Sequence, residues 1–168
     1  MPSSPIKKLS KVITFTPTIG TGAYSANQIV GGITKLADFF ESLSGVTELM
    51  NISVSDNANQ KIVGTFFFFK KKPAGTYTDG AAFSPSQADL NLIGAIVTLP
   101  AANYVSGASN AVGDIGNIRK KIQAATQTNQ IPNVTDSKSG YVVFVTGGTP
   151  TYGNASALQI SIGVEQDI

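Results

Sequence analysis

The chain of 168 residues contains no histidine, no cysteine and no tryptophan. Histidine and cysteine are the side chains that most often carry acid–base, thiol and transition-metal chemistry near neutral pH. Only ten residues are acidic, and no two of them stand out as the paired carboxyl groups that a glycosidase needs. These shortages favour a non-enzymatic protein that works through its surface, and we expect neither a cofactor nor a metal.

Charge is scarce as well. Charged residues make up 13% of the chain, against about 25% in ordinary soluble domains, and the net charge is only +2. A surface rich in serine, threonine, asparagine and alanine suits a protein that packs against neighbours. No apolar run approaches the ~18 residues of a membrane span, and the first ten residues lack the apolar core of a secretory signal. We therefore expect a protein made in the cytoplasm of its host cell, without a membrane contact.

The few charges are unevenly placed. Four lysines precede the first acidic residue of the chain: Lys7, Lys8, Lys11 and Lys35. We interpret residues 1–10 as a basic N-terminal arm and residues 11–168 as a single domain. The arm is either a solvated tail or an extended segment that lies on an acidic partner surface. In the second case the contact residues are Ile6, Lys7, Lys8 and Leu9.

Runs of strand length with alternating side chains occur along the whole chain, separated by glycine, proline and asparagine. The expected strands are 11–16, 33–39, 46–55, 61–69 and 92–99, a weaker pair near 108–112 and 115–122, then 141–146 and 158–164. This pattern predicts an all-β protein, an antiparallel β-sandwich of the jelly-roll type.

Helix is scarce. The best candidate is the segment 84–90, in which Ser84 would be the N-cap and Pro85 the first helical residue. The segment 119–125 is a weaker helix candidate. We expect one or two short helices at most.

The segments 46–55 and 61–69 are separated by a short polar stretch, 56–60, which favours a hairpin with a longish loop. This stretch offers side-chain oxygens, but it lacks the glycine and the distal glutamate of a calcium-binding loop. We therefore interpret it as a polar turn.

Four consecutive aromatic residues are the chain's most unusual run: Phe66, Phe67, Phe68 and Phe69. Because alternate residues of a strand point to opposite faces, two of the four must leave the core. That outward pair needs a cover, either from another segment of the chain or from a second subunit or partner. We include all four among the candidate partner-binding residues. The lysines that follow are interpreted as solvated residues that limit aggregation, and no nucleic acid is expected.

Several phrases of the sequence resemble a family of small virion proteins of tailed bacteriophages. They are TPTIGTGAYSANQIVGGI near the start, YTDGAAFSPSQADL with the strand LIGAIVTL, GGTPTY, and the closing IGVEQD. They follow one another in the same order from about residue 16 onward. The resemblance implies a jelly-roll-like sandwich in the virion, on the head or on a tail appendage, and it carries no catalytic residues.

The composition and the resemblance predict the same function. We expect a capsid decoration protein that binds the major capsid protein or other virion proteins outside the head, as a homotrimer. The alternative is a receptor- or carbohydrate-binding sandwich of a tail or head fibre. That alternative calls for a cluster of exposed tyrosine or tryptophan, whereas the five tyrosines are dispersed.

Overall fold

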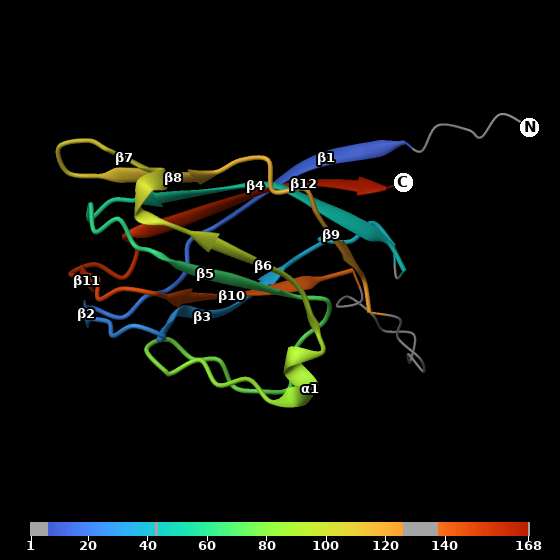
Figure 1. Cartoon of the computed structure of the whole chain (residues 1–168), viewed down its shortest axis with the longest axis horizontal. Helices are drawn as coiled ribbons and strands as arrows, with labels where there is room; N and C mark the ends of the chain where they lie inside the picture. Colours follow the sequence, from blue (N-terminus) through green and yellow to red (C-terminus); the bar gives the residue numbers. More distant parts are fainter. Residues whose placement is uncertain (1–6, 43, 126–137, 168) are drawn as a thin grey trace, which may run out of the picture.

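The computed structural model describes residues 7–42, 44–125 and 138–167. In this part of the chain β-strands dominate, and helix is limited to α1 (Gln87–Leu90) and one 3-10 turn, η1 (Ala101–Asn103). Two large sheets pack face to face, and the segment that carries α1 lies beneath the second sheet as a further layer (Figure 1).

Both large sheets are antiparallel. The first sheet runs in the order β1 (Lys8–Phe15), β12 (Leu158–Asp167), β4 (Val46–Asp56), β8 (Ala111–Ile115), β7 (Tyr104–Ser106), and β9 (Lys120–Gln123) also pairs with β4. The second sheet runs in the order β3 (Ile29–Leu36), β10 (Gly140–Thr146), β5 (Gly64–Phe69), β6 (Ile93–Leu99). A small third sheet pairs β2 (Gly22–Ala23) with β11 (Thr151–Tyr152).

The order of the strands identifies the fold. Eight main strands make up the two large sheets when the short β7 and β9 are set aside, and apart from β5–β6 each connection between them crosses from one large sheet to the other. Neighbours within a sheet are consequently far apart in the sequence, as in the pair of β1 with β12. Eight main strands wound in this way, in two antiparallel sheets, form a jelly roll. The predicted fold class is thus confirmed.

The main core lies between the two sheets. It receives alternate side chains from both, including Ile52 and Val54 of β4 and Phe66 and Phe68 of β5. Phe66 stacks on Phe144 with ring centroids 4.3 Å apart. Each such side chain contributes about 1.5–3 kcal/mol by leaving water, so alternation along the strands selects the faces that meet.

The predicted hairpin of 46–55 with 61–69 is wrong. β4 belongs to the first sheet and β5 to the second, so the segment between them crosses the sandwich instead of turning back on itself. The crossing begins at Asp56, which is fully buried and accepts a hydrogen bond from the amide of Ala58. Asn59 and Lys61 then adopt positive φ angles of 54° and 51°, which redirect the chain.

The short helix, the segment 119–125 and the bounds of one strand also differ from the prediction. Ser86, not Ser84, is the N-cap, because its hydroxyl accepts a hydrogen bond from the amide of Asp89 at 3.1 Å. The helix starts at Gln87 instead of Pro85. Residues 120–123 form β9 rather than a helix, since they pair with β4. β3 covers 29–36 instead of 33–39, and beyond it Phe39 turns into the core.

Candidate interaction surfaces

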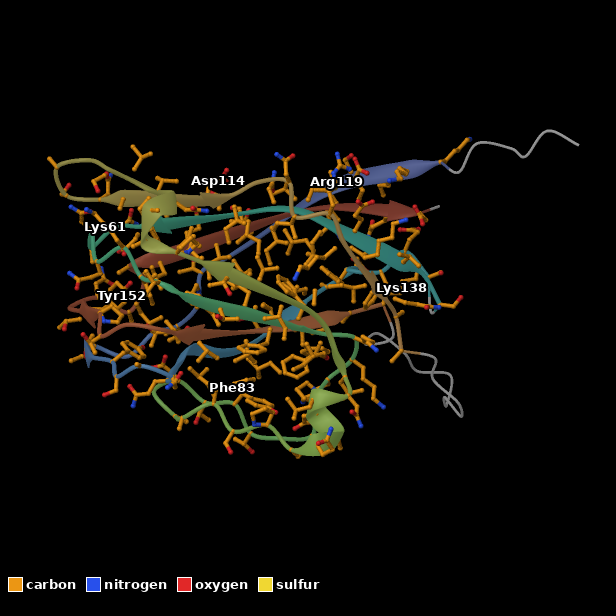
Figure 2. All side chains as sticks on the ribbon, viewed as in Figure 1. Lys61, Phe83, Asp114, Arg119, Lys138 and Tyr152 are labelled. Carbon is orange, nitrogen blue, oxygen red and sulfur yellow. The ribbon has the colours of Figure 1, made fainter. Side chains whose placement is uncertain are left out.

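The outer face of the second sheet carries a separate apolar cluster. Phe67 and Phe69 point away from the main core and pack against Phe83 and Tyr77, with ring centroids 4.4 and 5.8 Å apart. Both partners belong to residues 70–92, which we call the covering loop. The side chain of Phe83 lies on the side of this loop that faces the sheet (Figure 2). The chain therefore supplies its own cover for the outward pair.

A buried carboxylate closes the covering loop on itself. Asp89 is 1% exposed and accepts hydrogen bonds from the amides of Ala74 (2.8 Å) and Gly75 (3.0 Å) and from the hydroxyl of Tyr77 (2.8 Å). Burial alone would raise the pKa of Asp89, but these hydrogen bonds outweigh it and hold the pKa below its ordinary value. Burial and the bond to Asp89 raise the pKa of Tyr77 to about 12. The pair is thus ionised on the carboxylate and neutral on the phenol at neutral pH.

A second carboxylate ties the loop to the N-terminal part of the chain. Asp79 accepts hydrogen bonds from the hydroxyl of Tyr24 (2.7 Å) and from the amides of Gly20 (2.7 Å) and Gly31 (2.5 Å). Burial, and then the hydrogen bond to Asp79, raise the pKa of Tyr24. The Tyr24 hydroxyl and the two glycine amides all donate to Asp79. We therefore interpret Asp79 as a structural anchor that holds the covering loop in place.

The same loop seals the edge of the second sheet. The amide of Ile29 donates to Ala81 (2.8 Å), and the amide of Ile33 donates to Tyr77 (3.0 Å). Gly31 and Gly32 lie between these bonds with positive φ angles of 76° and 72°, which favour glycine. A Cβ on Gly31 would lie 2.2 Å from that of Pro17, so a side chain has no room there. The edge of β3 is therefore not open to a partner.

These contacts correct the partner-binding prediction for the aromatic run. Phe66 and Phe68 lie in the main core, and Phe69 is buried under the covering loop. Phe67 is half-buried. Alternation places two rings in each of two cores within one chain, and among the four rings Phe67 alone keeps partial exposure.

The predicted arm overlaps the first strand. Ile6 lies outside the described residues, and Lys7 is exposed just before β1. Lys8 and Leu9 already pair with Asp167 and Gln166 of β12. β1 thus begins at Lys8, three residues before the expected strand.

Lys8 joins two acidic side chains of neighbouring strands. Its ammonium group lies 3.2 Å from Glu48 of β4 and 3.0 Å from Glu165 of β12. The hydrogen bonds to these two carboxylates raise the pKa of Lys8, and the bond from Lys8 lowers the pKa of Glu48. Arg119 lies 3.7 Å from the other oxygen of Glu48 (Figure 2). Because all of these groups are near solvent, the network contributes little to stability but orients the start of β1.

The outer face of the first sheet carries small side chains in its central part. Ser161 of β12 stands opposite Ser53 of β4 and Thr14 of β1, and the hydroxyls of Thr14 and Ser161 are 2.9 Å apart. One step along, Gly163 stands between Val12 and Asn51. Such a face can stay in contact with water without a cover.

The edge of this sheet at β1 is open. β1 ends the sheet and pairs only with β12, and among the described residues no backbone hydrogen bond reaches its other side. Two of its apolar side chains are exposed, Leu9 by 44% and Val12 by 68%. Val12 also lines a hollow of about 290 Å³ together with Met50 and Val164. An open strand edge beside exposed apolar side chains is a site where another chain can add a strand.

The sequence analysis missed two of these surface features. Val12 lay there within the expected strand 11–16 without being singled out, although Ser10 and Thr14, two positions away on either side, indicate that this side of the strand faces solvent. Val105 and Val112 face each other across β7 and β8 and are exposed by 77% and 45%. Glycine and serine around these strands weaken the alternating pattern, so their orientation did not stand out.

The described residues offer neither a cluster of metal ligands nor a helix that could span a membrane. They contain no group of three acidic residues that could hold a metal ion. None of their helices has the length and apolar character needed to cross a membrane.

No known family model matches the chain, and no curated protein matches its sequence. Solved structures with a similar course of the chain include turnip yellow mosaic virus (11% identity, 99% of this chain and 84% of that chain covered, TM-score 0.32). They also include mud crab tombus-like virus (11% identity, 99% and 92%, TM-score 0.32) and sacbrood virus of honeybee (14% identity, 96% and 70%, TM-score 0.33). At these TM-scores the likeness carries no argument about function, and the fold is defined by the strand order given above.

Proposed function

We propose that this protein is a structural component of a bacteriophage virion, a decoration protein that binds the major capsid protein on the outside of the head. The observation that carries the proposal is the open edge of β1, with Leu9 and Val12 exposed beside the uncovered outer face of the first sheet. The sequence phrases that resemble virion proteins support the same assignment.

The chemistry of this edge predicts how the protein attaches. A strand edge offers backbone hydrogen bonds, while Val12 and the hollow beside it offer apolar area worth about 25 cal/mol per Å² buried. The one ion-pair network nearby already satisfies Lys8 within the chain. Attachment should therefore depend on apolar contact and shape, and should weaken only modestly between about 0.1 and 1 M salt, where exposed charges are screened.

We also propose that the protein assembles on the particle as a homotrimer. Closed symmetric assembly is the common solution for identical subunits. The covered aromatic run gives no reason for it, but the exposed pair Val105 and Val112 supplies an apolar patch at the edge opposite β1. In this proposal the edge at β1 contacts the capsid, and the patch of Val105 and Val112 contacts the second copy.

The test is occupancy on particles that lack the protein. Val12→Lys places a charge on the open edge and should lower occupancy at least tenfold, since charged side chains on an edge block strand addition. The matched control is Leu90→Lys, which changes an equally simple exposed apolar residue on α1, far from β1 in the fold, and should bind like the wild type. Removing residues 2–7 tests Ile6 and Lys7 while leaving β1 intact. Unchanged occupancy of Val12→Lys would overturn the proposed surface.

A carbohydrate- or receptor-binding role is the second candidate, and one hollow favours it. Phe67 and Phe83 line a depression of about 180 Å³ together with the polar side chains of Asn27 and Thr65. An aromatic floor with neutral polar groups suits a sugar ring. Glycan binding by the wild type that is lost in Asn27→Ala, with particle occupancy unchanged, would favour this role over decoration.

A further inference from the structure

The sandwich has a second open groove, between the two sheets at β6 and β9. Among the described residues, β6 ends the second sheet and β9 pairs only with β4, so each has an edge without a neighbouring strand there. Both strands lie on the same side of the molecule, where the sheets approach each other (Figure 1). The hollow between them measures about 420 Å³ and is lined by residues 93–96 together with Lys120 and Lys121.

This hollow continues along the same two strands. A neighbouring one of about 290 Å³ is lined by Lys70, Leu92 and Gln123, among others. The two form a groove that follows β6, a strand of seven residues. At its floor the backbone of Gly94 packs on Ile122, where a Cβ would lie 2.5 Å from the side chain. The groove is thus open above and closed below by apolar atoms.

The groove is basic. Lys70, Lys120 and Lys121 line it, and the exposed Lys71 and Lys72 follow directly on Lys70. These are five of the chain's twelve cationic residues, and no acidic residue lines either hollow. Among the described carboxylates, Glu48 faces Lys121 across the strands but is already bonded to Lys8. The groove therefore has an excess of positive charge in a chain whose net charge is only +2.

One hydrogen bond shows how the free edge is protected in the isolated chain. The ammonium group of Lys120 donates to the backbone carbonyl of Ile96 at 2.5 Å. That carbonyl is an acceptor of β6, and a flexible lysine occupies it in place of a neighbouring strand. A lysine on a strand edge is a common protection against unwanted pairing, and it can be displaced by a chain that brings its own amide and a carboxylate.

We propose that this groove binds an extended acidic segment of a partner protein, which adds a strand to β6. The backbone of the segment replaces Lys120 at the carbonyl of Ile96, and the ammonium group of Lys120 released in this way pairs with its carboxylates, as does that of Lys121. Since β6 has seven residues, at ~3.3 Å per residue the added strand spans about 23 Å.

The lining of the groove favours a peptide over a nucleic acid. Bases bind single-strand grooves by stacking on aromatic rings, and no aromatic residue lines either hollow. The single arginine, Arg119, is engaged with Glu48 and Met50. Unpaired backbone groups on a strand edge, in contrast, are satisfied by another peptide backbone.

The proposal can be tested with a fluorescent peptide of about eight residues, alternating glutamate and valine, with both ends capped. Binding is followed by anisotropy. The double variant Lys120→Ala/Lys121→Ala should bind about tenfold more weakly, because each exposed ion pair contributes up to ~1 kcal/mol. The matched control Lys61→Ala/Lys138→Ala removes the same charge elsewhere on the surface and should stay within about twofold of the wild type. Circular dichroism verifies that both variants are folded.

A second measurement separates strand addition from simple attraction between charges. Hydrogen exchange of the amides of 93–99 should slow when the peptide is bound, while exchange in β1 should not change. Binding without protection of β6 would overturn the proposal, as would equal binding by the Lys120→Ala/Lys121→Ala variant. Tighter binding of a single-stranded oligonucleotide of the same charge would also overturn it and assign the groove to nucleic acid.

Discussion

The two outer faces of the sandwich solve the same problem in opposite ways. On the second sheet, Phe67 and Phe69 turn large rings outward, and the covering loop takes them out of water. On the first sheet the central outward positions hold serine, threonine and glycine, charged side chains such as Glu48 lie beside them, and no loop among the described residues covers them. A sheet face in this protein is thus closed over its large aromatic side chains and left free over its small ones, and the free face can meet a partner without moving a loop.

The sharpest way to break this comparison is to remove one ring from the covered face. Phe69→Ala should lower the free energy of unfolding by about 3–5 kcal/mol, because a buried aromatic side chain is lost and a cavity remains. Ser161→Ala, on the free face, should change it by less than about 0.5 kcal/mol. Urea unfolding measures both. Similar effects for the two variants would mean that the covering loop does not close the second face.

A smaller effect is expected where the covering loop meets β3. Gly31→Ala and Gly80→Ala both place a side chain at positive φ, which costs roughly 1–2 kcal/mol. Only Gly31 also meets Pro17, whereas a Cβ on Gly80 has no neighbour within 4 Å. Gly31→Ala should therefore be the more destabilising of the two in thermal unfolding. Equal melting temperatures would contradict this, because they would mean that Pro17 can shift away from the new side chain without loss of stability.

The smallest effect is a dependence of the covering loop on pH. The pKa of Asp89 is lowered in the folded chain, so its contribution to stability is complete above its ordinary value of about 4. As the pH falls below this value the unfolded chain takes up a proton first, and the contribution is lost progressively toward the folded pKa. The wild type should lose more stability between neutral pH and about pH 3 than Asp89→Asn.

Urea midpoints at the two pH values measure this difference. Glu48→Gln is the control on the free face, where the lowered pKa belongs to a group near solvent and the loss should be smaller. If Asp89→Asn lost as much stability in acid as the wild type, the carboxylate would not be the acid-sensitive group of the loop.

The alternating pattern was enough to predict the fold class but not the neighbours of each strand. The period of two places Ile52 and Val54 on one face of β4 and Phe66 and Phe68 on one face of β5. The alternating pattern shows that each of these strands turns one face to the core. It does not show whether the two strands lie in the same sheet or in opposite sheets. The hairpin was therefore wrong, although both strands were found.

Part of the candidate sites was within reach of the sequence. The aromatic run predicted that the outward pair needs a cover but not which segment supplies it. In the sequence, the segment with Tyr77 and Phe83 cannot be told apart from an ordinary polar loop. The open edge of β1 was out of reach for another reason. Whether a strand lies at an edge depends on which strands pair with it, and β12 follows β1 by more than a hundred residues.

The pairing of β1 with β12 also sets the order in which the molecule can form. During synthesis the first strand leaves the ribosome long before its only partner, and β4 likewise waits for β12 on one side. Pairings of such high contact order make jelly rolls slow folders, in the range of milliseconds to seconds, since a long loop must close before any contact rewards it. Until then Val12 and Ile13 are exposed together on an unpaired strand. The edge that we assign to attachment is therefore also the segment most open to chaperones or to wrong partners while the chain is still growing.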